Sequence, residues 1–543
     1  MSRREQVFWG WGEPGAGPSL PDHAAGFLRS ELGVEGAVVS RPVALEQVRL
    51  REPALPAGAR ERLAGLVGEQ HVRDDAAARV GRCRGKSYLD LLRQRAGECE
   101  DAPDAVVAPG SAEEVQAVVY ACNDEGVAVV PFGGGTSVVG GLEPLRGRYD
   151  ALVSLDLGRL DGVESVDERS QLAWLRGGTR LPEADHALGQ RGFMLGHTPQ
   201  SYEWATVGGC VATRSAGQSS TGHGRIEENV VALRCATPAG ELATLAVPST
   251  AAGPSLRELV IGSEGVLGAI TSVGLRVFPV PAARRYEGWA FRGFEEGCEA
   301  LRALAQAEIA PDIARLSDEA ETRMSFVLAG GRGGAKGKAM GALLRGRSVL
   351  ICGWEGSEAS VGIRRRVTAK ALRGAGGWPL GQGPGDAWAA TRYAGPHARD
   401  DLMDRGVLVE TLETATTWSN LAHLRASVTR ALEGALGAPL VLCHASHVYA
   451  TGASLYVTVL AAADPGDPAA QWRRAKAAAT DAIVEAGGTI SHHHAVGADH
   501  APWLEAETGW LGHDVLRVLK ERCDPAGIMN PGKLLSGQGL RAY

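Results

Sequence analysis

A run of three glycines directly after an apolar segment constrains the fold of this 543-residue chain more than any other feature. The residues Val127 to Val130 predict a short buried strand. This strand leads straight into Pro131, Phe132, Gly133, Gly134, Gly135, Thr136 and Ser137. Glycines lack Cβ, so such a backbone can adopt positive φ and bring its N–H groups close to an anion. The loop predicts either a phosphate cradle or a plain tight turn, and its own residues do not decide between the two.

The composition excludes several classes of function. A net charge of -7 argues against a nucleic-acid partner, because such proteins carry a basic surplus or stripe. The nine cysteines never form a C-x-x-C pair, which predicts reduced, mostly buried thiols of a cytoplasmic protein instead of disulfides or a zinc site. The sequence contains neither a signal-peptide pattern nor an apolar run of about 18 residues, so we expect neither secretion nor a membrane span.

The order of the expected elements indicates an α+β fold built from several units. Residues 1–100 are expected to form a helical N-terminal arm, 101–282 a first α+β domain, 283–510 a second and 511–543 a C-terminal segment. The boundary near 282 follows Pro279-Val280-Pro281, since two prolines at that spacing cannot continue a central strand. Within the second unit, the Gly- and Lys-rich segment from Gly330 to Arg347 is expected to be a surface excursion.

Three further segments place glycine or polar turns against apolar, β-like sequence. They are Gly208 to Gly217, Gly262 to Gly268 and Asn530 to Leu535. Any one of them is compatible with a plain turn. Their joint occurrence with the first loop, in this order and at these intervals, is a much more specific pattern than any single turn.

With these motifs the chain resembles the FAD-binding flavoproteins of the vanillyl-alcohol oxidase or PCMH type. The matching segments read P-F-G-G-G-T-S, T-V-G-G-x-V-A-T-R-S-A-G, G-S-E-G-V-L-G and D-P-x-x-I-M-N-P-G-K-L-L, and the resemblance covers about residues 100 to 540. It implies a two-part FAD domain, an α+β cap over the flavin ring, and a chain end that returns to the FAD domain. The first loop has no histidine, so we expect non-covalent FAD. Besides the first loop, the expected FAD-binding residues are Gln200, Thr206, Thr213, Arg214, Ser215, Gly217, Gly262, Ser263, Glu264, Gly265, Val266, Leu267 and Gly268.

Other segments are similar to the alkyldihydroxyacetonephosphate synthases of that family. These segments are Ser491-His492-His493-His494, Ser454-Leu455-Tyr456-Val457, His397-Ala398-Arg399-Asp400, Arg315-Leu316-Ser317-Asp318 and the N-terminal Trp9-Gly10-Trp11-Gly12. The resemblance implies an FAD-dependent transferase of ether-lipid synthesis. Such an enzyme exchanges the acyl group of acyl-dihydroxyacetone phosphate for a fatty alcohol through an adduct at flavin N5.

The resemblance also assigns roles to the candidate catalytic residues. Tyr456 is expected to act as acid or base, His492, His493 and His494 to transfer protons, and Arg399 to hold the substrate phosphate, with Arg315 as a second active-site arginine. Imidazole suits the proton transfer because its pKa lies near neutrality. The implied partners are lipid substrates met at the inner membrane surface. The sequence does not decide whether the chain forms a homodimer.

Two alternatives remain for these residues. Tyr456 at the centre of a β-like run is also compatible with a core aromatic residue. A run of three histidines is also compatible with a metal site; on an extended segment His492 and His494 would converge while His493 points away, and we expect no metal.

The alternative function is an FAD-linked oxidase or dehydrogenase of a D-2-hydroxy acid or an alcohol. Members of that branch bind a metal through H-x-G-D-G-N-L-H and E-H-G-I-G. This chain places Tyr449 and Tyr456 at the two histidine positions and His493 at the glutamate position. Losing the hard carboxylate and both imidazoles argues against that metal centre.

Overall fold

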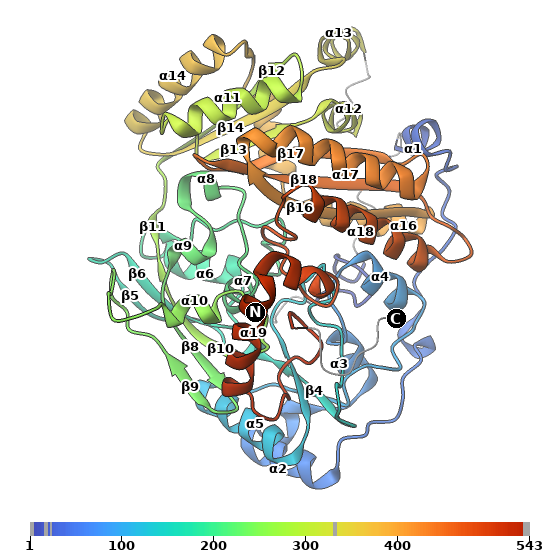
Figure 1. Cartoon of the computed structure of the whole chain (residues 1–543), viewed down its shortest axis with the longest axis vertical. Coiled ribbons are helices and arrows are strands. Elements are labelled where there is room, and N and C mark those ends of the chain that lie inside the picture. The colour runs from blue at the N-terminus through green and yellow to red at the C-terminus, as the bar shows by residue number, and fades with distance from the viewer. Residues whose placement is uncertain (1–4, 16–19, 22–23, 329–333, 536–543) are drawn as a thin grey trace.

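The chain folds into two bodies, which we call the base and the cap. The computed structural model describes residues 5–15, 20–21, 24–328 and 334–535. The base contains a four-stranded sheet, a five-stranded sheet and a two-stranded ribbon, and the cap contains one seven-stranded sheet. The cap occupies the upper half of the molecule in Figure 1 and the base the lower half.

The four-stranded sheet of the base presents the glycine loop. Its strands, in spatial order, are β1 (Val72–Arg73), β2 (Ala105–Val107), β4 (Leu152–Asp156) and β3 (Ala128–Phe132). The β-α-β order predicts that β2 and β3 are parallel. They are parallel, but each pairs with β4, which lies between them. The connecting helix α5 (Ala112–Glu125) begins where the Ser111 side chain accepts a hydrogen bond from the Glu114 amide, and it ends at Gly126 with φ 65°. Strand β3 continues through Pro131 and Phe132, so the loop proper starts at Gly133.

The five-stranded sheet of the base is antiparallel. Its strands, in spatial order, are β5 (Val163–Asp167), β6 (Leu172–Arg176), β10 (Ala269–Arg276), β8 (Val230–Thr237) and β9 (Gly240–Ala243). The sequence pattern predicts that the third of these strands begins at Val273, whereas it begins four residues earlier, at Ala269. All but the last residue of β10 are buried, so no polar alternation marks where the strand begins. The ribbon pairs β7 (Phe193–Met194) with β11 (Phe278–Pro279).

The helices of the base cover these sheets. They are α2 (Ala57–Val67), α3 (Ala76–Gly81), α4 (Tyr88–Arg95), α6 (Leu181–Gly189), α7 (Val207–Ala212), α8 (Ser220–His223), α9 (Ile226–Asn229), α10 (Leu256–Val260) and α19 (Leu504–Cys523). The sequence pattern predicts a helix from Asp514, but α19 begins ten residues earlier because the chain is helical on both sides of a kink at Gly509. Beyond α19, Met529 pairs with Val129 of β3, so the chain end lies beside the glycine-loop strand.

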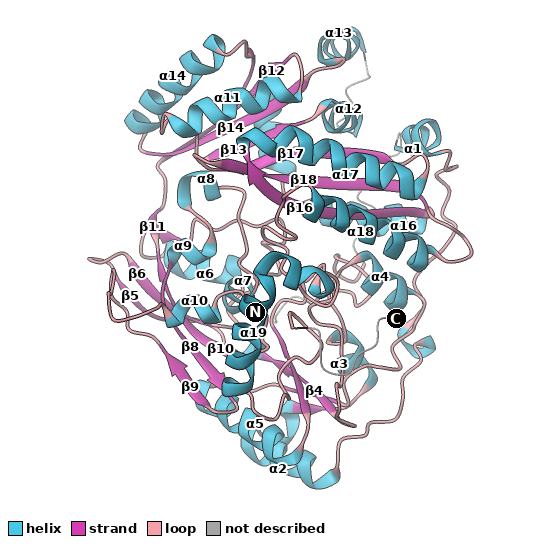
Figure 2. Cartoon of the chain, viewed as in Figure 1, coloured by secondary structure: helices cyan, strands magenta, loops and turns pink. Residues whose placement is uncertain are grey.

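The cap is a single antiparallel sheet with helices packed on it. Its strands, in spatial order, are β15 (Trp378–Gly381), β12 (Ala283–Phe291), β14 (Ser348–Gly356), β13 (Ile313–Ser317), β17 (Leu440–Val448), β18 (Gly452–Ala462) and β16 (Val407–Thr417). Its helices are α11 (Phe294–Gln306), α12 (Glu319–Leu328), α13 (Gly334–Leu344), α14 (Glu358–Gly374), α15 (Gly383–Thr391), α16 (Gly395–Asp404), α17 (Leu421–Leu436) and α18 (Pro468–Glu485). Figure 2 shows α11, α14 and α17 on the side of the sheet that faces away from the base.

Part of the segment expected to be a surface excursion is helix α13. Residues 330–333 of that segment lie outside the described residues. Met340 and Leu344 of α13 line the large cavity described below, so this helix forms a wall and is not a free excursion. Strand β16 is likewise not among the elements predicted from the sequence.

The N-terminal arm is tied to both bodies. The buried ammonium of Lys86 donates hydrogen bonds to the carbonyl oxygens of Val7 (3.0 Å) and Phe8 (3.1 Å). The Trp11 amide donates to Asp400 of α16 at 2.8 Å, and only 4% of the Trp11 side chain is exposed. Helix α1 (Ala24–Leu32) then packs on α12 and β18. The buried Trp11 and the hydrogen bonds from Lys86 therefore pin the arm to the body.

Two further expectations concern thiols and membranes. All nine cysteines are free, and all but Cys298 are buried, which confirms the prediction of reduced, buried thiols. Among the described residues, no helix combines the length and the apolar character that crossing a membrane requires.

Candidate active site

One cavity of about 950 Å³ lies between the base and the cap. From the base it is lined by the glycine loop, by the segment around α7 and by the turn before β10. From the cap it is lined by one face of the central strands, by α12 and α13, and by the start of α16. This volume lies at the upper end of the range of about 300–1,000 Å³ that is common for ligand sites.

The glycine loop lines the base end of this cavity with its backbone. A Cβ on Gly134 would lie 2.1 Å from the carbonyl oxygen of Trp204, and Gly135 has φ +70°, so both positions require glycine. Within the described part of the chain, no protein group accepts a hydrogen bond from the amides of Gly134, Gly135 and Thr136. Unpartnered amides beside a cavity are the donors that a diphosphate needs. These residues therefore fit FAD.

The second glycine segment forms the neighbouring wall. Thr206 caps α7 by accepting a hydrogen bond from the Gly209 amide at 3.2 Å, and the Thr213 hydroxyl donates to the Gly209 carbonyl at 2.9 Å. The capped helix presents Gly208 and Gly209 to the cavity, and the buried side-chain oxygen of Gln218 beside it has no hydrogen-bond partner among the described residues. A polar cofactor edge would satisfy this oxygen.

Not every expected FAD-binding residue reaches the cavity. Those that line it are Pro131, Phe132, Gly133, Gly134, Gly135, Thr136, Ser137, Gln200, Thr206, Thr213, Ser215, Glu264, Gly265 and Gly268. Those that do not are Arg214, Gly217, Gly262, Ser263, Val266 and Leu267. Arg214 pairs with Glu258 of α10 at 3.2 Å, and Val266 and Leu267 pack against Cys523. These residues support the wall from behind.

Tyr456 stands in a cross-strand row on the cavity face of the cap sheet. In the strand register Glu413 of β16 lies opposite Tyr456 of β18, which in turn lies opposite His444 of β17. The Tyr456 ring stacks on His444 with centroids 4.8 Å apart and lies 6.0 Å from the ring of His493. Burial raises the pKa of Tyr456 to about 12, so the phenol is protonated at neutral pH and can donate.

The three-histidine segment is folded around a buried carboxylate. The carboxylate of Glu413 accepts hydrogen bonds from the amides of His492 (2.8 Å), His493 (2.9 Å) and His494 (2.7 Å). It also accepts one from the Ser491 hydroxyl at 2.8 Å. Although burial alone raises the pKa of Glu413, the neighbouring His493 holds it well below the usual range. One glutamate thus fixes the backbone of the whole turn.

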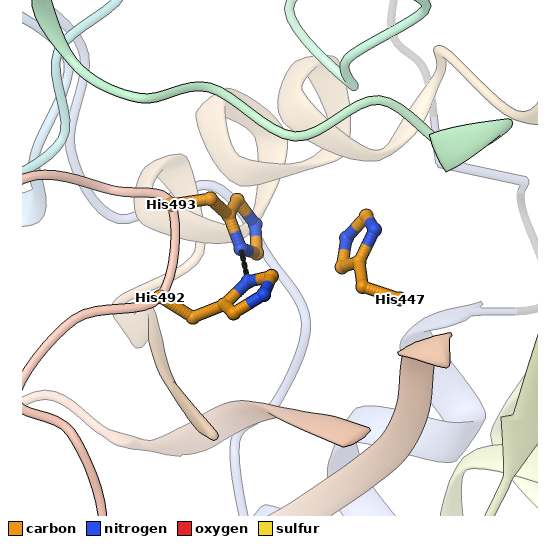
Figure 3. A group of neighbouring side chains, drawn as sticks. All are labelled: His447, His492 and His493. Atoms are coloured by element: carbon orange, nitrogen blue, oxygen red, sulfur yellow. Dashed lines mark hydrogen bonds between the residues drawn. The ribbon is translucent and has the colours of Figure 1, made fainter. Parts of the chain in front are cut away.

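The imidazoles of this turn do not point in alternating directions, as they would on an extended segment. The segment is not extended, so the side chains do not alternate. His492 and His493 face each other with their Nδ1 atoms 2.9 Å apart (Figure 3), and the half-buried ring of His494 meets Tyr456 edge-on at 5.4 Å. Burial lowers the pKa of His494 to about 3, which keeps this imidazole neutral. His493 and His494 line the cavity, and His492 lies behind them.

Replacing Glu413 with glutamine is expected to disorder the turn. An amide nitrogen at the Oε2 position would face the His492 amide, and a buried donor without an acceptor costs about 1–3 kcal/mol. We expect a lower denaturant midpoint and at least ~10-fold lower turnover because the imidazoles move. The control Glu433→Gln changes an exposed glutamate of α17 and should leave both quantities unchanged. Equal denaturation midpoints for Glu413→Gln and the unsubstituted protein would contradict this role.

The two predicted arginines line the cavity but already have acidic partners. Arg315 donates to Glu321 of α12 at 2.7 Å and lies 3.1 Å from His444 Nδ1. Burial alone would raise the pKa of Glu321, but Arg315 and His444 lower it to about 2. Arg399 donates to the buried carboxylate of Glu410 at 2.6 Å and to the Lys86 carbonyl at 2.8 Å.

Several groups that hold the predicted residues in place are not among the sequence predictions. These groups are Glu321, Glu410, Glu413, His444 and His447; Tyr449 is named from the sequence only as a position where a metal-binding histidine is lost. His447 shares the edge of the site with His492, whose Nε2 lies 2.8 Å from the Tyr449 hydroxyl. Only one local signal was available for the glutamates: two acidic residues within a run of Val, Leu and Thr that is typical of a strand.

Comparison with known proteins agrees with this site. The FAD binding domain family matches residues 103–246, and the family of C-terminal domains of FAD linked oxidases matches residues 280–534. The alkyldihydroxyacetonephosphate synthase of Dictyostelium discoideum is 34% identical over 94% of this chain and 87% of its own length. A solved structure of an alkyldihydroxyacetonephosphate synthase superposes with a TM-score of 0.83 at 29% identity, covering 97% of this chain and 98% of that one.

A more distant structure supports the fold alone. p-Cresol methylhydroxylase superposes with a TM-score of 0.70 at 16% identity, over 90% of this chain and 99% of that one. The predicted α+β fold of the PCMH type, with FAD as cofactor, is confirmed. The chain belongs to the alkyldihydroxyacetonephosphate synthase family of FAD-binding flavoproteins.

Proposed function

We propose that this chain is an FAD-dependent transferase that exchanges the acyl group of acyl-dihydroxyacetone phosphate for a fatty alcohol. The observation that carries the proposal is the continuity of one cavity. It joins the glycine loop and Tyr456 to an apolar wall formed by Met324, Phe326, Leu328, Met340 and Leu344. A fatty chain would occupy such a wall, whereas a small hydroxy acid would leave it unfilled.

The exchange requires two proton movements and no net redox change. The bond between the substrate carbon and the acyl oxygen breaks, the carboxylate leaves, and the alcohol oxygen forms the new bond. FAD, when bound, supplies the nucleophilic ring nitrogen that this chemistry uses. We assign Tyr456 as the donor to the leaving carboxylate, because its phenol is protonated and faces the cavity. Neutral imidazoles of the His492–His494 turn can accept the proton of the alcohol.

The phosphate of the substrate needs a cation in the same cavity. We propose Arg399 for this contact, with Arg315 as the second cation. Arg399 would share its guanidinium between Glu410 and the phosphate, and Arg315 would share its own between Glu321 and the phosphate. Both pairs leave some of the five guanidinium N–H groups for the substrate.

Two parallel assays test this function. The FAD-loaded protein is incubated with acyl-dihydroxyacetone phosphate and hexadecanol, and free fatty acid and alkyl product are measured; D-lactate and related hydroxy acids are added anaerobically in parallel. We expect equal amounts of acid and alkyl product, and no bleaching of the flavin by the hydroxy acids. Rapid bleaching by a hydroxy acid without acid release would instead support the FAD-linked dehydrogenase.

A larger side chain in the apolar wall should shift the substrate preference toward shorter alcohols. Met324→Trp on α12 is expected to exclude about two methylenes, at about 0.8 kcal/mol each, and so to lower kcat/KM for hexadecanol ~15-fold. Octanol should be affected less than about twofold, because its chain ends before the blocked part. Ile363→Trp on α14, at a position 54% exposed, is the control and should change neither value. Equal losses for both alcohols would refute the assignment of this wall.

The proposed substrates dissolve in membranes, so we also propose peripheral contact with a lipid surface. Helix α19 carries an exposed apolar row of Trp510, Leu511, Val515 and Val518, which either lipid or a second copy of the chain could cover. Vesicle flotation and sedimentation equilibrium distinguish the two. Flotation that is lost in Trp510→Ser would support membrane contact, and a concentration-dependent dimer lost in the same variant would support self-association.

A further inference from the structure

Three imidazoles from two separate segments meet beside the cavity. His447 lies near the end of β17, and His492 and His493 lie in the turn held by Glu413. Each offers one ring nitrogen, and these three nitrogens all lie within 4.8 Å of one another. Figure 3 shows His447 on one side, facing the pair formed by His492 and His493. No other group of histidine, cysteine and carboxylate side chains in the described ranges is gathered in this way.

The separation inside the pair is close to the spacing of two adjacent ligands on one ion. His492 Nδ1 and His493 Nδ1 are 2.9 Å apart. Bonds of about 2.0–2.1 Å from nitrogen to Zn²⁺ place adjacent ligands ~3.0–3.4 Å from each other. Without an ion, one of the two nitrogens must carry a proton toward the other, so the geometry serves a hydrogen bond or a shared ion equally well. The third imidazole distinguishes the two, because a hydrogen bond does not need it.

Outer partners select the free nitrogen on two of the three rings. Ser220 lies 2.5 Å from His447 Nδ1, which leaves Nε2 of that ring. The Tyr449 hydroxyl lies 2.8 Å from His492 Nε2, which leaves Nδ1. The carboxylate of Glu413 lies 3.3 Å from His493 Nδ1, the nitrogen that also faces His492, so it places negative charge beside the site but selects no nitrogen on that ring. Hydrogen-bonding partners on the outer nitrogen of metal-binding histidines set the tautomer and orient the ring in this manner.

We propose that His447, His492 and His493 bind one divalent transition-metal ion of the Zn²⁺ class, in which case His494 is the imidazole of the turn that remains to accept the proton of the alcohol. Three imidazoles with an open fourth position form the donor set of catalytic zinc sites. His447 and His493 line the cavity, so the open position faces it and can take an oxygen atom of a substrate. The 4.8 Å separation must close by about 1.4 Å to reach the ~3.4 Å between two ligands of one tetrahedral ion. The proposal departs from the sequence-based expectation that no metal binds.

Metal binding can be measured without substrate, so its outcome is separate from the proposed reaction. The untagged, FAD-loaded protein is dialysed against a chelator and titrated with Zn²⁺, and the metal retained after desalting is counted by mass spectrometry. Co²⁺ is used in parallel, because a tetrahedral nitrogen site gives absorption bands beyond the main flavin band. The variants are His447→Gln and His493→Gln. His494→Gln in the same turn and His423→Gln, exposed on α17, are matched controls.

We expect one Zn²⁺ per chain in the unsubstituted protein and in both controls, and about 100-fold weaker binding in His447→Gln and His493→Gln. The flavin absorbance of each variant verifies that its base is folded. Less than a tenth of an equivalent of Zn²⁺ in the unsubstituted protein would overturn the proposal. So would equal binding in all variants, since the ion would then be held elsewhere on the protein.

Discussion

A Gly134→Ala substitution is expected to give a folded protein that purifies without FAD. The new Cβ would lie 2.1 Å from the carbonyl oxygen of Trp204, which is backbone and cannot rotate away. The loop must therefore shift, and the amides of Gly134 and Gly135 would move with it. Losing two hydrogen bonds to a charged diphosphate, at about 1.5–3 kcal/mol each, removes at least ~3 kcal/mol and lowers FAD affinity ~100-fold or more. The ratio of flavin to protein absorbance after desalting measures the loss.

The control separates loss of the cradle from general unfolding. Gly434→Ala places a methyl group on helix α17, where nothing lies within 4 Å of the new Cβ. Alanine is favoured over glycine in a helix interior by about 1 kcal/mol, so this variant should be as stable as the original chain or more stable. It should also keep its full FAD content. Stoichiometric FAD in Gly134→Ala would show that the loop is a plain turn.

Tyr456→Phe is expected to abolish turnover while the protein stays yellow. Only the hydroxyl group is removed, and the ring keeps its contacts with His444 and His493. General acid catalysis contributes about 10²–10⁴-fold, so kcat should fall by that factor. Because burial raises the pKa of Tyr456 to about 12, the unsubstituted enzyme should show no loss of activity centred near pH 10, where an exposed tyrosine ionises. The pH profile of kcat measures this.

The matched control for Tyr456 is Tyr120→Phe on α5, where the side chain is 43% exposed. It removes a phenol far from the cavity and should change kcat by less than about twofold. FAD content should equal that of the original protein in both variants, since neither residue belongs to the glycine loop. A kcat in Tyr456→Phe within threefold of the original value would mean that Tyr456 is the half-buried core aromatic residue that the sequence also allowed.

Local signals made much of the base predictable. The strand β2, the cap at Ser111 and the strand β3 each have a signature within a few residues. Strand β16 has the opposite character, because Glu410 and Glu413 give it the polarity of a surface segment although both side chains are buried. Their burial depends on partners from other elements, Arg399 for one and the His492–His494 turn for the other. No pattern within the segment contains that information.

The same difference between local sequence signals and contacts with distant elements explains which site residues could be predicted. Tyr456 and the three histidines were found because they stand in short motifs. His444 and Glu413 join Tyr456 only through the register of β17, β18 and β16. His447 reaches His492 through the folding back of a segment more than forty residues further along the chain. Such contacts are set by strand pairing and by loop paths, which composition and periodicity do not specify.

The chain end completes the base, and this has a consequence for synthesis on the ribosome. Met529 pairs with Val129, and the side-chain amide of Asn530 donates to the carbonyls of Gly141 (3.2 Å) and Glu264 (2.6 Å). The cap sheet lies between these two parts of the base in the sequence. At about 5–20 residues per second, the ribosome needs on the order of tens of seconds to pass from the first part to the second. The nascent base therefore remains incomplete while the cap is made, and FAD can be enclosed only after Met529 and Asn530 have been synthesised.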